Sequence, residues 1–255
     1  AYYLWLSVGG VLGGISAALV APRVFSWVAE YPLLIVLAVL CRPGLALPRG
    51  RGEVALWGAG LALAVALLLP RYLYQLELDE THYRWAIATL IAVALLMARH
   101  PLRFAAGIAF VLMFARVYGN DISLESVRSF FGVHKVIESH DGRFHILTHG
   151  TTIHGAQRVR DEAGRLLTGR PEPIAYFGAR SPMAIAFAAA RERKDNLRIA
   201  VVGLGAGTLA CYTRPGDVLD FYEIDPAVVR IASDPRYFTY LSSCAPDAKI
   251  IVGDA

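Results

Sequence analysis

The sequence contains few cysteines and few charged residues, and each shortage excludes a class of protein. Its three cysteines, Cys41, Cys211 and Cys244, have separations that match neither a metal-binding nor a redox motif. We therefore expect no disulfide framework, which agrees with a reducing compartment. Charged residues make up 18% of the chain, and they form no basic patch with interleaved aromatics. Nucleic acid is therefore not an expected partner.

The histidine spacing does not predict a metal site. The candidates for metal ligation are His145, His149 and His154. If these residues lie in extended strands, His145 and His149 share one face and His154 lies on the other. We therefore interpret them as surface or pocket histidines, and we expect no bound metal.

Apolar residues are abundant, and they are concentrated in the first half of the chain. Hydrophobic residues make up 56% of the sequence, which is unusual for a soluble domain. Residues 1–118 are dominated by Ala, Leu, Val and Gly, whereas residues 122–255 have the composition of a globular domain. This distribution predicts a membrane domain followed by a water-soluble part.

Apolar segments in the first half are candidate membrane spans. A span needs about 20 predominantly apolar residues. The candidates are residues 2–20, 24–41, 54–70, 85–98 and 102–118. Tryptophans lie within or near the ends of these segments, as residues that anchor a helix at the membrane interface do. We therefore expect about five membrane helices, with the lipid bilayer as a partner.

The second half is organised around a strand, a glycine turn and a second strand. An apolar run is followed by three alternate glycines, Gly203, Gly205 and Gly207, and a second apolar run ends in Glu223. Glycine permits backbone angles that side chains forbid and lets a ligand approach the main chain. An acidic residue about twenty positions later typically binds a ribose diol. The G-x-G-x-G spacing favours S-adenosylmethionine or a relative of it over NAD.

The remaining patterns predict the elements around this motif. Strands are expected at 130–138, 143–148, 151–159, 199–202, 218–222 and 248–252, and helices at 181–191, from about 208, and at 226–233. The expected fold is a multi-pass α-helical membrane domain, then a small β-hairpin layer, then a Rossmann-like α/β domain of the methyltransferase type, truncated after its third strand.

The expected domains follow from these elements. Residues 1–118 are the transmembrane domain, 119–128 a linker, 129–160 the β-hairpin layer, and 161–255 an incomplete Rossmann-like nucleoside-binding domain. The chain opens within an apolar segment without an initiator methionine and stops at Ala255. We therefore expect it to come from a longer protein.

Several of these motifs together resemble the spermidine/spermine synthase family, and in particular its membrane-fused bacterial members. The resemblance covers roughly residues 124–255. It rests on four runs, namely Phe130-Phe131-Gly132-Val133, Val201-Val202-Gly203-Leu204-Gly205-Ala206-Gly207-Thr208, Tyr222-Glu223-Ile224-Asp225 and Gly253-Asp254-Ala255. It implies that the chain transfers an aminopropyl group from decarboxylated S-adenosylmethionine to a polyamine such as putrescine, releasing methylthioadenosine. A homodimer is the oligomeric state that we consider for such a chain.

The resemblance assigns roles to individual residues by position. Gly203, Gly205 and Gly207 face the nucleoside and its tail, and Glu223 accepts hydrogen bonds from both ribose hydroxyls. Ile224 packs on the adenine, and Asp254 accepts a hydrogen bond from its amino group. The substrate-binding candidates are Tyr176, His154 and Gln157. The catalytic aspartate of the family lies after the next strand, beyond Ala255, so the resemblance assigns no catalytic residue within this chain.

This sequence departs from the family pattern at several of these positions. Soluble members carry Asp-Gly-x-x-Gln in the hairpin layer, whereas histidine replaces the acid in the runs at 149–153 and 154–157 here. The family's amine-recognition motif is represented at 172–178 by Tyr176 without the histidine that follows it. The glycine turn has also lost an aspartate that would meet the tail of the cofactor.

Two other functions remain open because of these departures. One is a methyltransferase that uses S-adenosylmethionine itself. The other is a transporter or scaffold whose synthase domain is degenerate, which the overlapping G-x-x-x-G pairs of residues 9–14 favour because they bare a helix face for close packing.

The loop charges and the cofactor predict opposite orientations in the membrane. Arginines concentrate in loops 42–53 and 99–103, which the positive-inside rule makes cytoplasmic. Strict alternation over five spans would then put the part after residue 118 outside. We nevertheless expect the soluble part in the cytoplasm, where its cofactor is made, and the helices in a bacterial inner membrane.

Overall fold

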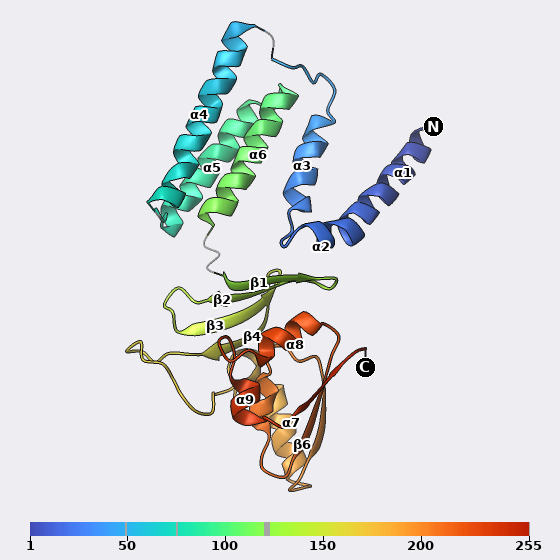
Figure 1. Ribbon diagram of the computed structural model, residues 1–255, viewed down its shortest axis with the longest axis vertical. Helices are drawn as coiled ribbons and strands as arrows, with labels where there is room; N and C mark the ends of the chain where they lie inside the picture. The colour runs from blue at the N-terminus through green and yellow to red at the C-terminus, as the bar shows by residue number, and fades with distance from the viewer. Residues whose placement is uncertain (49, 75, 120–122, 255) are drawn as a thin grey trace. The chain divides into compact units, whose positions relative to one another are not determined.

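The computed structural model describes residues 1–48, 50–74, 76–119 and 123–254. By their internal contacts these residues form two compact units (Figure 1). One unit is Val28–Asp121, and the other combines Ala1–Trp27 with Ile122–Ala255. The first unit is helical, whereas the second contains both β-sheets and the residues predicted to form the site.

The N-terminal region consists of apolar helices joined by short connections. They are α1 (Tyr2–Ile15), which continues through the π-helix η1 (Ser16–Val20) into α2 (Ala21–Val24), and then α3 (Glu30–Leu40), α4 (Arg51–Leu73), α5 (Glu80–Leu96) and α6 (Pro101–Tyr118). Asp79 begins α5 as a cap, because its side chain accepts a hydrogen bond from the His82 amide at 2.8 Å.

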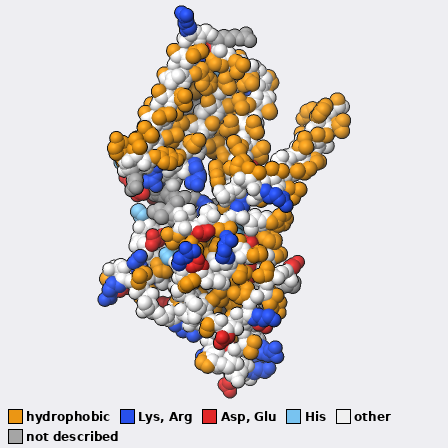
Figure 2. All heavy atoms as spheres, viewed as in Figure 1, with side chains coloured by type: hydrophobic (Ala, Val, Ile, Leu, Met, Phe, Trp, Pro, Cys, Tyr) orange, Lys and Arg blue, Asp and Glu red, His pale blue; other side chains and the backbone are white. Residues whose placement is uncertain are grey.

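Among the described residues of this region, three helices are long and apolar enough to cross a membrane, namely Tyr2–Val24, Arg51–Leu73 and Pro101–Tyr118. These confirm three of the five expected spans. The other two, α3 with 11 residues and α5 with 17, are shorter than the usual span. Figure 2 shows hydrophobic side chains covering the helices. A helix that is apolar on all sides requires an apolar environment, so these helices indicate a membrane protein.

The helices of the first unit approach closely where a small residue permits it. A Cβ at Gly107 of α6 would lie 3.0 Å from the Cβ of Ala94 on α5, and the Tyr118 hydroxyl donates to the Leu67 carbonyl at 2.7 Å. The glycines of the G-x-x-x-G pairs in α1 have no atom within 4 Å of an added Cβ.

An antiparallel sheet of four strands begins the soluble part. The strands are β1 (Ser123–Ser129), β2 (Gly132–Glu138), β3 (Phe144–His149) and β4 (Thr152–Arg158), and they pair in chain order. Gly142, with φ +65°, closes the expected turn between β2 and β3 by donating its amide hydrogen to the Ser139 carbonyl at 2.7 Å.

The strand β1 was not predicted, because its sequence is mainly polar. It occupies most of the segment 119–128 that was expected to be a linker, and residues 120–122 of that segment lie outside the described residues. Val127 packs against the core, and pairing with β2 along its length satisfies the backbone of β1. The pairing partner, rather than local apolar alternation, therefore makes this segment a strand.

A parallel sheet of three strands follows, as expected. The strands β5 (Arg198–Val202), β6 (Val218–Glu223) and β7 (Lys249–Val252) pair in this order. The surrounding helices are η2 (Ala175–Phe177), α7 (Pro182–Arg191), η3 (Thr208–Tyr212), α8 (Pro226–Ser233) and α9 (Tyr240–Cys244). The helix expected after the glycine turn is only the short 3₁₀-helix η3. It ends just before Thr213, whose hydroxyl donates to the Ala210 carbonyl at 2.6 Å.

Two apolar cores hold the soluble part together. The first lies between the parallel sheet and its helices and contains Leu204, Leu209, Ala210, Leu219, Phe221, Val228, Ala232, Leu241 and Cys244. The second joins the antiparallel sheet to α8, to the segment that leads into α9 and to the glycine turn, and contains Val136, Leu147, Ala206, Ile231, Phe238 and Tyr240. Because Ala206 belongs to the glycine turn, the antiparallel sheet packs directly against the predicted site.

Candidate functional site

The parallel strands bring the predicted nucleoside-binding residues to one edge of the sheet. The Gly203 amide, after β5, donates to the Tyr222 carbonyl on β6 at 2.8 Å. The Gly253 amide, after β7, donates to the Glu223 carbonyl at 3.0 Å. Gly203, Glu223 and Asp254 therefore lie at the carboxyl ends of adjacent strands, which is where open α/β sheets bind ligands.

The glycines of the turn serve different purposes. All three have a positive φ, +87° at Gly203, +55° at Gly205 and +82° at Gly207. A Cβ at Gly205 would lie 2.6 Å from the His154 carbonyl oxygen, and one at Gly207 would lie 3.0 Å from Leu241 Cγ. A Cβ at Gly203 would meet nothing within 4 Å. Gly205 and Gly207 are thus required for internal packing, whereas Gly203 leaves main chain open to an approaching molecule.

The Glu223 carboxylate fixes the shape of this edge. Its side chain is buried, with 8% of the residue exposed. One oxygen, Oε2, accepts the Leu204 amide of the glycine turn at 2.8 Å, and the other, Oε1, accepts the Asp225 amide at 2.9 Å. A carboxylate offers about four acceptor positions, and these two amides use two of them. The structural role of Glu223 was not predicted from the sequence.

Asp225 begins α8, as its position before Pro226 predicts. Its Oδ1 accepts the Ala227 amide at 2.8 Å, which is the expected N-terminal cap. Its Oδ2 also accepts the Ser129 hydroxyl at 2.5 Å and His134 Nε2 at 2.8 Å. Burial opposes ionisation of this carboxyl group, but the hydrogen bonds outweigh burial and lower its pKa. Asp225 is therefore a buried junction between the two sheets and not only a cap.

Ile224 and Asp254 are the accessible members of the edge. Ile224 follows Glu223 and is 44% exposed, and Asp254 is also exposed. This edge therefore has an exposed aliphatic side chain next in sequence to the Glu223 carboxylate, and an exposed carboxylate at the end of the adjacent strand. This combination matches the chemistry of a nucleoside, which has an aromatic base and a polar ribose.

Three histidines form a row across the antiparallel sheet. His134 pairs with His149 in the register of β2 and β3, and their rings stack with centroids 4.8 Å apart. The His149 and His154 rings are 5.7 Å apart. The expectation that His154 points away from His149 was wrong, because a β-bulge between Leu147 and Thr148 shifts the register of β4. Within the described residues, no group of His, Cys, Asp or Glu is arranged to hold a metal ion.

His154 is the histidine of the row nearest to the glycine turn. Burial lowers the pKa of its imidazole, and the neighbouring rings of His149 and His134 lower it further, whereas Glu223 raises it. A lowered pKa favours the neutral ring, which accepts a hydrogen bond or a proton through one nitrogen.

The other two substrate-binding candidates differ in accessibility. Tyr176 is half exposed, and with Ala175 and residues 178–182 it lines a shallow hollow. Its hydroxyl donates to the Ile153 carbonyl at 3.3 Å. This contact brings it next to His154. Gln157 is buried, and its amide both accepts from the Thr239 amide and donates to the Thr239 hydroxyl, each at 2.8 Å. Gln157 therefore fixes β4 to the segment before α9.

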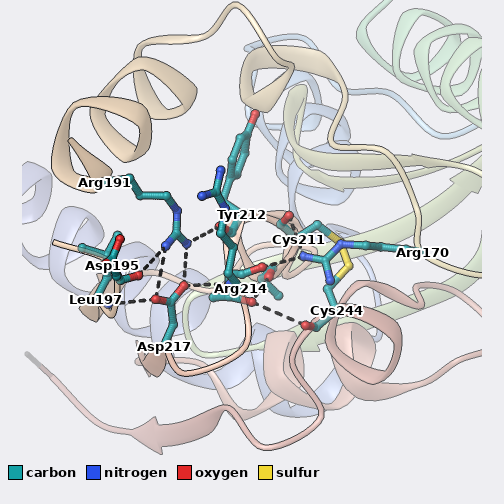
Figure 3. A network of polar contacts seen from close by, with 11 residues as sticks. Arg170, Arg191, Asp195, Leu197, Cys211, Tyr212, Arg214, Asp217 and Cys244 are labelled. Carbon is teal, nitrogen blue, oxygen red and sulfur yellow. Dashed lines mark hydrogen bonds and ion pairs between the residues drawn. A yellow bond between two sulfur atoms is a disulfide. The ribbon is translucent and has the colours of Figure 1, made fainter.

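A buried ion pair fixes the segment that follows the glycine turn (Figure 3). Asp217 accepts two hydrogen bonds from Arg191, at 2.5 and 3.3 Å, and further bonds from the amides of Leu197 and Arg214. Arg191 also donates to the Tyr212 carbonyl at 3.0 Å. These bonds join the end of α7, the start of β5 and the end of η3. They therefore hold in place the segment that follows the glycine turn.

The segment after the glycine turn is also held by a disulfide, which was not expected. Cys211 of η3 is bonded to Cys244 at the end of α9, with their Cα atoms 4.8 Å apart (Figure 3). The expectation of no disulfide was wrong for this pair. The two cysteines are 33 residues apart and show no motif, and they meet only because η3 packs against α9. Arg170 donates to the carbonyls of Cys211 and Thr213 beside this bond.

Comparisons with known proteins do not supply a function for this geometry. No family model matches the chain, and no curated protein or solved structure matches it either.

The Asp217–Arg191 pair generates a prediction about acid stability. Hydrogen bonds from Arg191 hold the pKa of Asp217 well below its usual range, so the charged form stabilises the fold above pH about 4 and this stabilisation is lost as pH falls further. Asp217→Asn should lower the free energy of unfolding at pH 7 by about 3 kcal/mol or more, because Arg191 loses its buried partner. The difference from wild type should shrink at pH 3.

Urea unfolding in detergent, followed by circular dichroism, measures this difference. Asp234→Asn is the control, since Asp234 pairs with an exposed arginine, Arg236, and should be much less destabilising. An Asp217→Asn deficit that is equal at pH 7 and pH 3 would contradict the ion-pair account.

Proposed function

We propose that the chain belongs to a membrane-anchored enzyme that binds an S-adenosyl nucleoside at the edge formed by Gly203, Glu223 and Asp254. The observation that supports this most strongly is the main chain left open at Gly203 beside a carboxylate that two amides hold in place. The ribose hydroxyls would donate to the remaining acceptor positions of Glu223. Such charge-assisted bonds contribute roughly 1.5–3 kcal/mol each.

The remaining residues of the edge complete this assignment. The adenine would pack on Ile224, and its amino group would donate to Asp254. Gly203 would face the tail of the nucleoside, with Gly205 and Gly207 maintaining the turn behind it. The Glu223 carboxylate and the exposed Ile224 side chain lie within one strand end, which supports a single compact ligand.

The reaction that we propose is aminopropyl transfer from decarboxylated S-adenosylmethionine to a polyamine such as putrescine. The transferred carbon is already activated by the sulfonium, so the protein mainly aligns a neutral amine with it and accepts one proton. The residues that would meet the amine are His154, whose carbonyl lies beside Gly205, and Tyr176, whose hydroxyl bonds to the carbonyl of the neighbouring Ile153. The bond from S to the aminopropyl carbon breaks, the bond from that carbon to the amine forms, and methylthioadenosine leaves. No catalytic residue is assigned within this chain.

The proposed location is the inner membrane of a bacterium, with the soluble part on the cytoplasmic side where the nucleoside is made. The Cys211–Cys244 disulfide argues against this side, because disulfides are typical of oxidising compartments. The three long apolar helices support the membrane anchor. The proposal also includes a homodimer as the oligomeric state to be tested.

A methyltransferase that uses S-adenosylmethionine is the second candidate. The glycine turn and the strand-end glutamate are the features that favour it, because both reactions need the same nucleoside contacts. The antiparallel sheet packed on the turn favours aminopropyl transfer instead. A transporter or scaffold without enzymatic activity is the third candidate, and the overlapping G-x-x-x-G pairs of α1 favour it.

Calorimetry separates these candidates. The intact chain in nanodiscs is titrated with methylthioadenosine, decarboxylated S-adenosylmethionine and S-adenosylmethionine. Aminopropyl transfer predicts that the decarboxylated nucleoside binds at least tenfold more tightly than the carboxylated one. The reverse preference would favour the methyltransferase, and no heat with any of the three would remove the nucleoside site.

A substitution at the open glycine tests the position of the ligand. Gly203→Ala should weaken methylthioadenosine binding at least tenfold, about 1.4 kcal/mol, because the new methyl group occupies the space of the ligand. The matched control is Gly164→Ala. Gly164 has a similar φ of +78° and equally open surroundings but lies in a loop away from the edge. Equal affinity of both variants for the nucleoside would place the ligand elsewhere.

A further inference from the structure

A continuous line of hydrogen bonds connects the antiparallel sheet to the Glu223 carboxylate. It begins at Ser129, the last residue of β1, and at His134 on β2, which both bond to Asp225 Oδ2, at 2.5 and 2.8 Å. It continues through the Asp225 amide to Glu223 Oε1 at 2.9 Å, and from Glu223 Oε2 to the Leu204 amide at 2.8 Å. Every link lies within the soluble part.

The central members of this line are shielded from water. Asp225 is 2% exposed and His134 is 6% exposed. Hydrogen bonds from charged or polar donors strongly stabilise a buried carboxylate. Leaving one of its oxygens without a donor costs free energy. The position of Asp225 therefore depends on His134, and the Asp225 amide in turn orients Glu223.

His134 also has contacts that restrict its own ring. The His149 ring stacks on it, and a Cβ at Gly132 would lie 2.0 Å from His149 Nε2, so the glycine allows His149 to lie close to the main chain. Bonding to Asp225 uses Nε2, while Nδ1 is buried and has no hydrogen-bond partner among the described residues. The stacked ring and the single bond to Asp225 hold the imidazole in one orientation.

We propose that His134 is a positioning residue for the nucleoside site, acting on Glu223 through Asp225. The proposal rests on the proposed function, because it assigns the ribose contact to Glu223. His134 makes no contact with Glu223 or with the glycine turn in the hydrogen bonds described here, and its effect passes through the Asp225 backbone. The antiparallel sheet thereby takes part in binding the nucleoside, although its strands lie outside the parallel sheet that carries the site.

Two variants of His134 separate positioning from general stability. His134→Ala removes the donor to Asp225, whereas His134→Gln keeps a donor at nearly the position of Nε2. Ser129→Ala removes the second donor to the same oxygen and is a milder change. The intact chain in nanodiscs is used throughout, with methylthioadenosine as the ligand and hydrogen exchange of the backbone amides as the second readout.

The expected result is a site-specific loss that glutamine rescues. His134→Ala should weaken methylthioadenosine binding at least tenfold and speed exchange at least tenfold at the Leu204 and Asp225 amides. The amides of β5 and β7 should exchange as in wild type. His134→Gln should restore both measurements to within about threefold of wild type, and Ser129→Ala should shift both in the same direction as His134→Ala.

Other outcomes overturn the proposal or the function separately. Unchanged exchange at Leu204 and Asp225 in His134→Ala would overturn the positioning role, and so would faster exchange spread evenly over both sheets. If wild type binds no nucleoside while the exchange changes stay confined to Leu204 and Asp225, the positioning of Glu223 stands and the proposed function fails.

Discussion

The Glu223 carboxylate is the contact on which the arrangement of the soluble part depends. It ends β6, accepts an amide of the glycine turn after β5, and accepts the first amide of the segment that leads into α8. These three elements would otherwise be joined at this edge only by strand pairing and side-chain packing. Because the carboxylate is buried and bound by two amides, its position at this edge is fixed by contacts from both neighbouring segments.

The antiparallel sheet contributes to this edge more than a covering layer would. The His154 carbonyl lies where a side chain at Gly205 would be, a Cβ at Gly155 would lie 2.5 Å from Ala206 Cβ, and Asp225 is bonded from β1 and β2. On the opposite side, the Arg191–Asp217 pair and the Cys211–Cys244 bond fix the segment after the turn. The glycine turn is therefore held from both sides, while Gly203 alone of its glycines faces open space.

Local patterns in the sequence predicted the parts of this structure that local forces determine. Glycines followed by a strand-end acid identified the edge, and apolar length identified three helices that are long and apolar enough to cross a membrane, whereas α3 and α5 are shorter. The missed features depend on residues that are far apart. The strand β1 exists through its pairing with β2, the bulge in β4 turned His154 toward His149, and the disulfide and the Asp225 junction join residues 33 and more than 90 positions apart. No spacing rule in a single sequence reports such contacts.

The most direct test of this account is ligand-dependent hydrogen exchange of the intact chain in nanodiscs. Amide exchange is measured with and without saturating methylthioadenosine, and protection is mapped residue by residue. The account predicts slower exchange at residues 203–207 and at 223–225, with the helical unit 28–121 unchanged. Protection confined to the helices, or none at the glycine turn, would contradict the claim that this strand edge is a nucleoside site.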